Sequence, residues 1–545
     1  MLKISHFSVP RIPVTLTGLV IILSVYFGTV MNYPVLKKIF MLSADVSNSG
    51  FPWTAPVLLI CAFLILFSAI AWPYLLKPVM CLLLLSSAAA LYAEVNFNVL
   101  FDTTMMESVF ETNASEISFY MNPASLLYFV GFGGVPCLLL CMVKIVPHRS
   151  WMVAICARMA VLIVAIAGIG LIAATHYKDY ASVGRNNHYL NKMIIPAQVY
   201  SGYRYLEKKY LSRPLAYQFQ GEDARVLPAR NGKPTLMVVV LGETARAMNF
   251  AYNGYPRNTN PYTENLGLIS FRDVSSCGTY TALSVPCMFS SLTRTQYNEP
   301  RAKTQDNVLD VMQHAGVDVL WVDNDGGDKG VAKHLPYRTV NPDLKNQACN
   351  GTTCFDEAML HDAQTFIDGE VRNKILVLHT IGSHGPTYWQ RYPEEQAPFQ
   401  PACNRSDLEN CTDQQIRNVY DNTLVYTDSI LAKVIQQLIH VDDTYNVMLT
   451  YISDHGESLG EGGFYLHGAP YAIAPREQTQ VPWLLWLPDN DARQKGLDAH
   501  CLRQKAQQAS LTHDAFFHSL LGLYGVQTDI KDPALDVTQS CKISA

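Results

Sequence analysis

Val447–Glu457 reads VMLTYISDHGE, and this stretch decides the fold class of the larger part of the chain. Its apolar, β-forming run ends at Asp454, as a buried parallel strand does when it brings polar side chains to the carboxyl edge of a sheet. Asp454 and His455 point to opposite faces of a straight strand, so they converge only where the chain bends, which Gly456 permits. A carboxylate and an imidazole that meet there suit zinc or manganese. A plain turn with a capped carboxylate would explain this motif alone equally well.

Three further apolar runs end in polar residues in the same way. They are Leu236–Leu241, followed by Glu243; Val317–Val322, followed by Asp323 and Asp325; and Ile375–His379, followed by His384. The segments between the runs are long enough to hold helices, which predicts a largely parallel α/β sheet that is covered on both faces and collects ligands at its carboxyl edge. We interpret His379 as a buried structural histidine, and Asp323 and Asp325 as turn residues outside the metal set.

The first 175 residues are far more apolar than the rest and predict five membrane spans. The spans are Ile12–Leu36, Val46–Leu76, Pro78–Ala93, Ile117–Val143 and Met159–Thr175, and none contains a charged residue. Pro78–Ala93 is the shortest, yet with its flanks it approaches the roughly 20 residues that a bilayer core requires. Lys3 and Arg11 before an apolar run also fit a signal peptide, but four more hydrophobic segments argue against that interpretation.

Charged residues around the spans predict their orientation. Basic residues flank them on one side (Lys3, Arg11, Lys77, Lys144 and Arg149), whereas the loop Glu94–Glu116 holds five acidic residues and no Lys or Arg. By the positive-inside rule, the N-terminus is cytoplasmic, and five spans place everything after His176 outside the cytoplasm. Lys37 and Lys38 lie on the outer side and are the exception to this pattern.

The cysteines agree with this topology. Five of the 13 lie in or at the ends of the predicted spans, where a thiol is a small apolar group. The other eight all follow His176 and form local pairs: Cys277 with Cys287, Cys349 with Cys354, Cys403 with Cys411, and Cys501 with Cys541. Such pairs in an extracytoplasmic domain indicate disulfides. Structural zinc is the poorer explanation because Cys-x2-Cys spacing is absent.

The composition shifts predict three regions: a membrane domain over 1–175, a connector over 176–232 and a soluble α/β domain over 233–545. Tyr and basic residues within Ala197–Tyr210 suggest an interfacial helix, although an ordinary amphipathic surface helix would have the same composition. The net charge of −5 and the pI near 6.3 provide no basic surface for nucleic acid.

A hydroxyl nucleophile is expected in the loop between Cys277 and Cys287. This loop offers Thr279, Thr281 and Ser284, and a disulfide would clamp it where distant ligands converge. A hydroxyl at the start of a helix would also have backbone N–H groups nearby to bind phosphate oxygens. The chemistry alone leaves the choice among the three hydroxyls open.

Several longer motifs give the chain a family resemblance. They are GETAR (242–246), SCGT with SVPCMFS (276–290), GSHGPTY (382–388), YDNTLVYTD (420–428), SDHGESLGE (453–461) and YLHG (465–468). With them the chain resembles, over its whole length, the phosphoethanolamine transferases that modify lipid A, which include the mobile colistin-resistance enzymes. The resemblance implies five spans before an alkaline-phosphatase- or sulfatase-like α/β domain.

The resemblance also implies site residues. Thr281 matches the family's nucleophile, and Glu243, Thr281, Asp454 and His455 match its first zinc site. His384 and His467 match histidines on the phosphate side, which are candidates to hold a second zinc ion. The other substrate-binding candidates are Lys329 and His334 for phosphate and Ser108, Thr112 and Glu116 for the lipid headgroup. Three features depart from the family pattern. Asp328 and Ala332 occupy positions where many relatives have a further disulfide. His334 occupies a position that is usually basic, and Tyr280 replaces a small residue.

We therefore expect an inner-membrane, multi-pass, zinc-dependent enzyme whose catalytic domain lies in the periplasm and acts as a monomer among membrane lipids. It would transfer phosphoethanolamine from phosphatidylethanolamine to a phosphate of lipid A through a covalent threonine intermediate. The added amine would lower the negative charge of the surface and confer polymyxin resistance. The alternatives are a hydrolase of the same superfamily, a transferase that acts on core sugars, and a catalytically silent receptor for anionic lipid.

Overall fold

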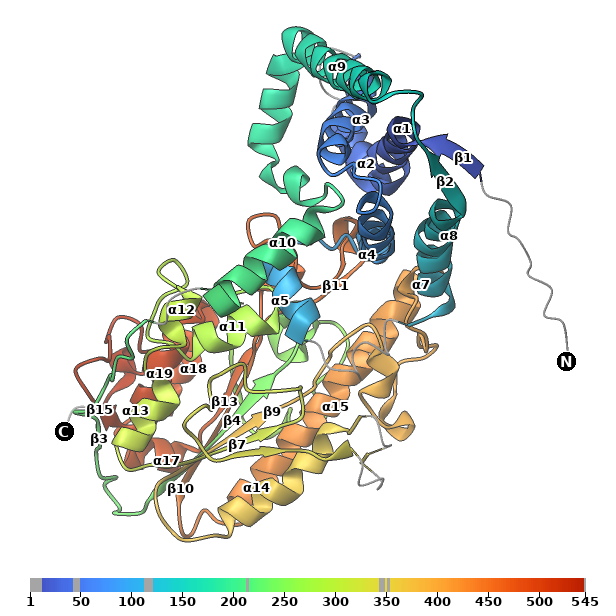
Figure 1. Cartoon of the computed structure of the whole chain (residues 1–545). Helices are drawn as coiled ribbons and strands as arrows, with labels where there is room; N and C mark the ends of the chain where they lie inside the picture. The colour runs from blue at the N-terminus through green and yellow to red at the C-terminus, as the bar shows by residue number, and fades with distance from the viewer. Residues whose placement is uncertain are drawn as a thin grey trace, which may run out of the picture. The chain divides into compact units, whose positions relative to one another are not determined.

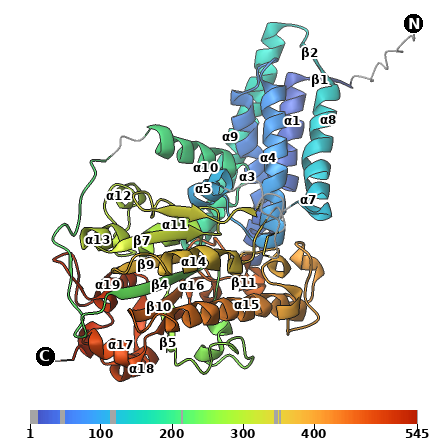
Figure 2. The same cartoon turned by 90° about the horizontal axis from the view of Figure 1, so that it is seen from below.

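The computed structural model describes residues 12–42, 50–111, 121–211, 215–342, 348–349 and 353–543. The chain divides into two compact units, one made of Met1–Phe110 and Met121–Leu211, the other of Glu111–Tyr120 and Ser212–Ala545. The first unit is helical and the second is α/β, as the sequence predicts (Figures 1 and 2). The residues of the predicted connector are shared between the two units, with the division at Leu211.

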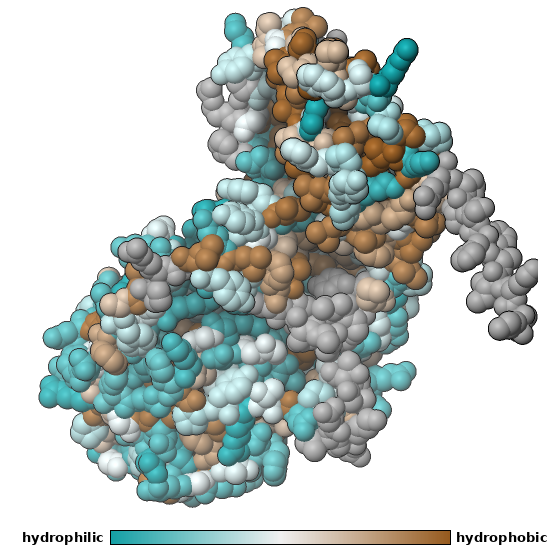
Figure 3. Space-filling model, in the orientation of Figure 1, coloured by the Kyte–Doolittle hydropathy of each residue, from teal (hydrophilic) through white to brown (hydrophobic). Residues whose placement is uncertain are grey.

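The helical unit contains the predicted spans. Its helices include α1 (Leu16–Tyr26), a π-helical turn (Phe27–Met31), α2 (Tyr33–Leu42), α3 (Phe51–Ala69), α4 (Leu76–Phe97), α5 (Thr103–Glu111), α7 (Pro123–Tyr128), α8 (Val135–Met142), α9 (Trp151–Asn186) and α10 (Ala197–Leu206), and the short strands β1 (Ile12–Thr15) and β2 (Val143–Val146) pair in parallel. Among the described residues, four helical segments are long and apolar enough to cross a membrane: α3, α4, Pro123–Met142 and Trp151–Tyr180. A fifth is obtained if Leu16–Met31 and α2, which are bent by 54°, form one span. Hydrophobic side chains gather over this unit in Figure 3, as lipid-facing helices require.

Asn32 lies at the break between the first two helices and explains how the break is stabilised. Its side-chain amide donates to the carbonyls of Phe27 and Ile195, and its oxygen accepts from the Ile195 backbone N–H. Asn32 is fully buried, so these bonds replace those that the interrupted helix loses.

The soluble unit is organised around a seven-stranded sheet within the described residues. The strand order is β5 (Ile269–Phe271), β13 (Trp483–Trp486), β10 (Asn446–Ser453), β4 (Thr235–Gly242), β9 (Lys374–His379), β7 (Asp318–Asp323) and β8 (Tyr337–Thr339). The four predicted strands are confirmed and form the parallel centre of the sheet, β10-β4-β9-β7. β13 pairs antiparallel to β10 and was not predicted.

Helices cover both faces of this sheet. Met237, Val239 and Leu241 of β4 belong to one core with residues of α13 (Val308–His314), α18 (Ala499–Gln508) and α19 (Asp514–Tyr524). The intervening residues of β4 are equally buried and point to the opposite face, where Figure 1 shows α14 (Leu360–Ile367) and α15 (Asp413–Ile439). Burial on both faces explains why the central strands are continuous apolar runs.

Candidate active site

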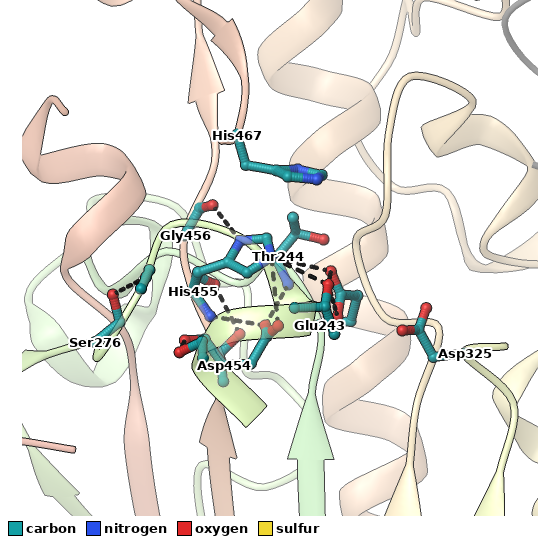
Figure 4. Close-up of polar contacts among 12 residues, drawn as sticks. Glu243, Thr244, Ser276, Asp325, Asp454, His455, Gly456 and His467 are labelled. Atoms are coloured by element: carbon teal, nitrogen blue, oxygen red, sulfur yellow. Dashed lines mark hydrogen bonds and ion pairs between the residues drawn. The ribbon is translucent and has the colours of Figure 1, made fainter. Parts of the chain in front are cut away.

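Strand register brings the first ligands together. Gly242 of β4 lies opposite Ser453 of β10, so Glu243 and Asp454 follow at the same edge of the sheet. Thr281 comes from the start of α11 (Thr281–Met288), beyond the sheet. Figure 4 shows Glu243, Asp454 and His455 facing one another at this edge.

The four residues that resemble a zinc site lie within contact distance. Thr281 Oγ1 is 3.2 Å from each carboxylate oxygen of Glu243 and 3.4 Å from His455 Nε2. His455 Nε2 is 3.3 Å from Glu243 Oε1 and 3.3 Å from Asp454 Oδ2. Glu243, Asp454 and His455 are fully buried, so the two carboxylate charges act on one another with little screening by water.

Hydrogen bonds around these residues favour a divalent cation. His455 Nδ1 lies 2.9 Å from the Gly456 carbonyl, which places the ring proton there and leaves the Nε2 lone pair facing the carboxylates. Asp454 Oδ1 accepts from the backbone N–H groups of His455 and Thr244, while Oδ2 is buried without a hydrogen-bond partner among the described residues. Burial, followed by repulsion from Asp454, raises the pKa of Glu243 well above its usual range. The donor set therefore fits the metal that the sequence predicts.

Gly456 is required for a reason other than the bend that the sequence suggests. Its backbone φ is not in the left-handed region that favours glycine. A Cβ atom at this position would instead lie 2.0 Å from the carbonyl oxygen of Glu477. Close approach of two backbone segments therefore excludes any side chain.

The structure distinguishes the three hydroxyls that the sequence left open. Thr279 Oγ1 donates to the Ala469 carbonyl at 2.7 Å, and Ser284 Oγ donates to the Asp454 carbonyl. Both side chains are buried. Thr281 is half-buried, and its hydroxyl points at Glu243 and His455. Thr281 is thus the hydroxyl that lies beside the candidate metal ligands.

The loop that carries Thr281 is held by a disulfide and by a histidine that the sequence did not single out. His513 Nδ1 accepts from the Cys277 backbone N–H, and its Nε2 lies 3.1 Å from the Ser453 carbonyl. His513 therefore links the nucleophile loop to the end of β10. The described part of the chain contains the predicted disulfides Cys277–Cys287, Cys349–Cys354, Cys403–Cys411 and Cys501–Cys541.

Two more histidines lie beside this group. The rings of His467 and His455 are 4.5 Å apart, and those of His467 and His384 are 5.5 Å apart. His467 Nδ1 lies 2.9 Å from Glu457 Oε2, and Glu457 also accepts from the Tyr388 hydroxyl. Removal from water, together with the nearby charges of His467 and Arg391, lowers the pKa of His384 well below its usual range. Glu457 is the last residue of the Val447–Glu457 motif, but the sequence did not indicate that its carboxylate orients the His467 ring.

Of the two basic candidates, Lys329 acts electrostatically on this group. Burial and repulsion from Asp454 raise the pKa of Glu243, and the positive charge of Lys329 opposes this rise. The Lys329 Nζ lies 3.4 and 3.5 Å from the backbone carbonyls of Asp325 and Gly326. His334 instead contacts Asp310 at 3.5 Å and Tyr217 at 3.4 Å. In the turn that lacks the family's disulfide, the Asp328 carboxylate accepts from the Ala332 N–H at 2.6 Å.

Comparison with known proteins identifies the family. The family model "Sulfatase" matches residues 235–526, and the model "Phosphoethanolamine transferase EptA/EptB" matches residues 59–210. The phosphoethanolamine transferase EptA of Escherichia coli K12 is 42% identical over 475 residues, 86% of each chain. The chain belongs to the phosphoethanolamine transferase family. The phosphatidylethanolamine transferase Mcr-1 of Escherichia coli is 36% identical over 94% of this transferase and 96% of its own length. The integral membrane lipooligosaccharide phosphoethanolamine transferase A of Neisseria meningitidis matches 98% of the chain, and is itself covered completely, with a TM-score of 0.93 and 35% identity.

The roles of the remaining sequence-predicted residues of this transferase stay predictions. Ser108 lies on α5 in the helical unit. Thr112 and Glu116 lie outside the described residues. Tyr280 is the residue before α11, next to Thr281, and its side chain does not cap the helix.

His513 predicts how the stability of the soluble unit depends on pH. Burial lowers its pKa from 6.5 to about 4. Between pH 6.5 and about 4 the imidazole is therefore protonated in the unfolded chain and neutral in the folded chain. The stability that His513 contributes is complete above pH about 6.5 and is lost as the pH falls towards 4. The expected contribution is about 3 kcal/mol.

Urea unfolding of the soluble unit at several pH values between 4 and 7 measures this effect. His513→Gln should flatten the dependence of the unfolding free energy on pH in this window. His361→Gln, which changes an exposed histidine, should leave it unchanged. An identical dependence in the wild type and in His513→Gln would contradict the prediction.

Proposed function

We propose that this transferase moves phosphoethanolamine from phosphatidylethanolamine to a phosphate of lipid A through a covalent intermediate on Thr281. The position of Thr281 Oγ1, within 3.4 Å of both Glu243 and His455, carries the proposal. The relatives support the substrates, since one is a phosphatidylethanolamine transferase and another is a lipooligosaccharide phosphoethanolamine transferase.

Glu243, Thr281, Asp454 and His455 would hold a zinc ion. Two observations support this assignment: among the described residues Asp454 Oδ2 is buried without a hydrogen bond, and the His455 Nε2 lone pair faces the carboxylates. When bound, the ion supplies positive charge that lowers the cost of deprotonating the Thr281 hydroxyl and of developing negative charge on the phosphoryl group.

The protein's own residues direct two displacements at phosphorus. In the first, Thr281 Oγ1 bonds to the phosphorus of phosphatidylethanolamine, the bond to diacylglycerol breaks, and the hydroxyl proton ends on the diacylglycerol oxygen. Thr281 donates its hydrogen bond towards Glu243, which orients an oxygen lone pair for attack. In the second, a hydroxyl oxygen of a lipid A phosphate bonds to the same phosphorus, the bond to Thr281 Oγ1 breaks, and the proton that the phosphate loses returns to Thr281 Oγ1.

Residues around Thr281 would bind the phosphoryl oxygens. His467 is oriented by Glu457, and His384 is its neighbour, so both rings are held in place before the substrate arrives. Lys329 would add positive charge. Ser108, Thr112 and Glu116 would hold the donor headgroup, with the Glu116 carboxylate paired to its ammonium group. His334 would also bind phosphate, although its side chain contacts Asp310 and Tyr217 in this structure.

The reaction would take place on the periplasmic side of the inner membrane. The basic residues on one side of the spans and the disulfides of the soluble unit support this orientation. Both substrates are lipids, so a monomer anchored by its spans would meet them in the same leaflet. Each added amine lowers the negative charge that binds cationic polymyxins, and resistance would follow.

Mass spectrometry of lipid A from cells that express the chain tests this function. We expect lipid A whose mass is increased by one phosphoethanolamine group, together with diacylglycerol release in membranes. Free phosphoethanolamine with unchanged lipid A would indicate the hydrolase instead. Modification confined to core sugars would show that the acceptor is wrong.

A further inference from the structure

A second group of metal-binding side chains lies on the other side of Glu243. Ligand atoms of Glu243, Asp325 and His379 are all within 4.8 Å of one another. Glu243 and His379 have no exposed surface, and Asp325 is 5% exposed. In Figure 4, Glu243 lies between His455 and Asp325. Glu243 thus belongs to two candidate ligand sets at once.

His379 has the orientation of a metal-binding histidine. In the register of β7 and β9 it lies opposite Asp323, and its Nδ1 is 2.8 Å from Asp323 Oδ2. Asp323 is fixed as an acceptor because it also receives hydrogen bonds from the Trp321 indole and from the backbone N–H groups of Asp325 and Gly327. The ring proton is therefore held on Nδ1, the carboxylate–histidine arrangement that orients metal ligands.

The other nitrogen of His379 is buried without a hydrogen bond. Among the described residues, Nε2 has no hydrogen-bond partner, and it lies 3.6 Å from Asp325 Oδ2. An unsatisfied buried polar atom destabilises the folded state, and a bound ligand would offset that cost. In its neutral form, this imidazole offers the Nε2 lone pair beside the carboxylates of Asp325 and Glu243, and the three side chains together make a ligand set for a cation.

The charges at this edge of the sheet also favour a cation. Four buried carboxylates converge there, those of Glu243, Asp323, Asp325 and Asp454. An ion held by Glu243, Asp454 and His455 would lie on one side of Glu243, and the carboxylates of Asp323 and Asp325 would lie on the other side. Lys329 contributes a positive charge from that side. Burying several carboxylates beside one ammonium group is costly, and a second divalent ion would reduce that cost.

We propose that Glu243, Asp325 and His379 bind a second divalent cation, zinc or manganese, so that Glu243 bridges two ions. The nitrogen and oxygen donors suit these metals. A bridging Glu243 would be held rigidly beside Thr281. The proposal rests on the proposed function in that both use Glu243 as a metal ligand. Its test counts bound ions and does not measure transfer, so the second site and the proposed function can fail independently. It also differs from a second zinc at His384 and His467.

Metal content of the purified full-length protein tests the proposal. After saturation with zinc and removal of free ions, elemental analysis should show that Asp325→Asn loses one bound ion relative to the wild type. Asp328→Asn removes a carboxylate from the same loop, outside the ligand set, and should lose none. His467→Ala should keep the ion that depends on Asp325. Equal zinc content in Asp325→Asn and the wild type would overturn the site.

A spectroscopic measurement separates metal binding from a structural role of Asp325. Two Mn²⁺ ions that share a carboxylate are magnetically coupled, so the manganese-loaded wild type should give a coupled electron paramagnetic resonance spectrum. Asp325→Asn should give the spectrum of an isolated ion while its melting temperature shows that it is folded. An uncoupled spectrum in the wild type at saturating manganese would contradict a bridging Glu243.

Discussion

Thr281→Ala is expected to lower phosphoethanolamine transfer by at least ~10³-fold, because it removes the atom that forms the covalent bond. The fold should remain, since Thr281 is half-buried at the start of α11 and the change should alter the unfolding free energy by no more than about 1 kcal/mol. Transfer is measured on purified protein with phosphatidylethanolamine and lipid A, and stability by thermal unfolding of the same samples.

Two further variants make this result specific. Thr281→Ser keeps a hydroxyl and should restore part of the activity. Thr279→Ala removes a hydroxyl two residues away that donates to Ala469, and it should reduce stability more than transfer. Mass spectrometry of a stalled wild-type reaction should place phosphoethanolamine on the peptide that contains Thr281. Transfer by Thr281→Ala at the wild-type rate would show that another hydroxyl is the nucleophile.

Asp454→Asn is expected to reduce both the zinc content and the transfer rate. The amide oxygen can still accept from the His455 and Thr244 backbone N–H groups, so the local backbone should be retained. The negative charge at the position of Oδ2, which faces His455 Nε2 at 3.3 Å, is lost. Removing a direct ligand should cost more than the ~10–100-fold that loss of an outer hydrogen-bond partner costs.

Zinc titration and transfer assays on the same preparations check this prediction. Excess zinc should restore part of the activity of Asp454→Asn, because the remaining ligands are still present. Asp328→Asn, which removes a carboxylate whose partner is the Ala332 N–H, should bind zinc as the wild type does. Full zinc occupancy in Asp454→Asn at limiting zinc would remove Asp454 from the ligand set.

Local composition was enough to predict most of the framework. Long uncharged runs predict the spans because a bilayer core requires that length of apolar helix. Continuous apolar runs predict β4, β7, β9 and β10 because both faces of a central parallel strand are buried. The short edge strands were missed: β8 has three exposed residues, and β5 has three that gain their pairing only from the distant β13. Nothing local distinguishes such strands from loops.

The sequence by itself determined the class of site, since polar residues that follow parallel strands must meet at one edge of the sheet. The tertiary structure decided which side chains meet there. Thr281 lies beside Glu243 and His455 across separations of 38 and 174 residues, whereas Thr279 and Ser284 are committed to backbone carbonyls. The sequence predicts that His379 is buried, but only the β7–β9 register places Asp323 on one ring nitrogen and leaves the other 3.6 Å from Asp325. Side-chain direction depends on register and packing between distant segments, and spacing along the chain does not encode it.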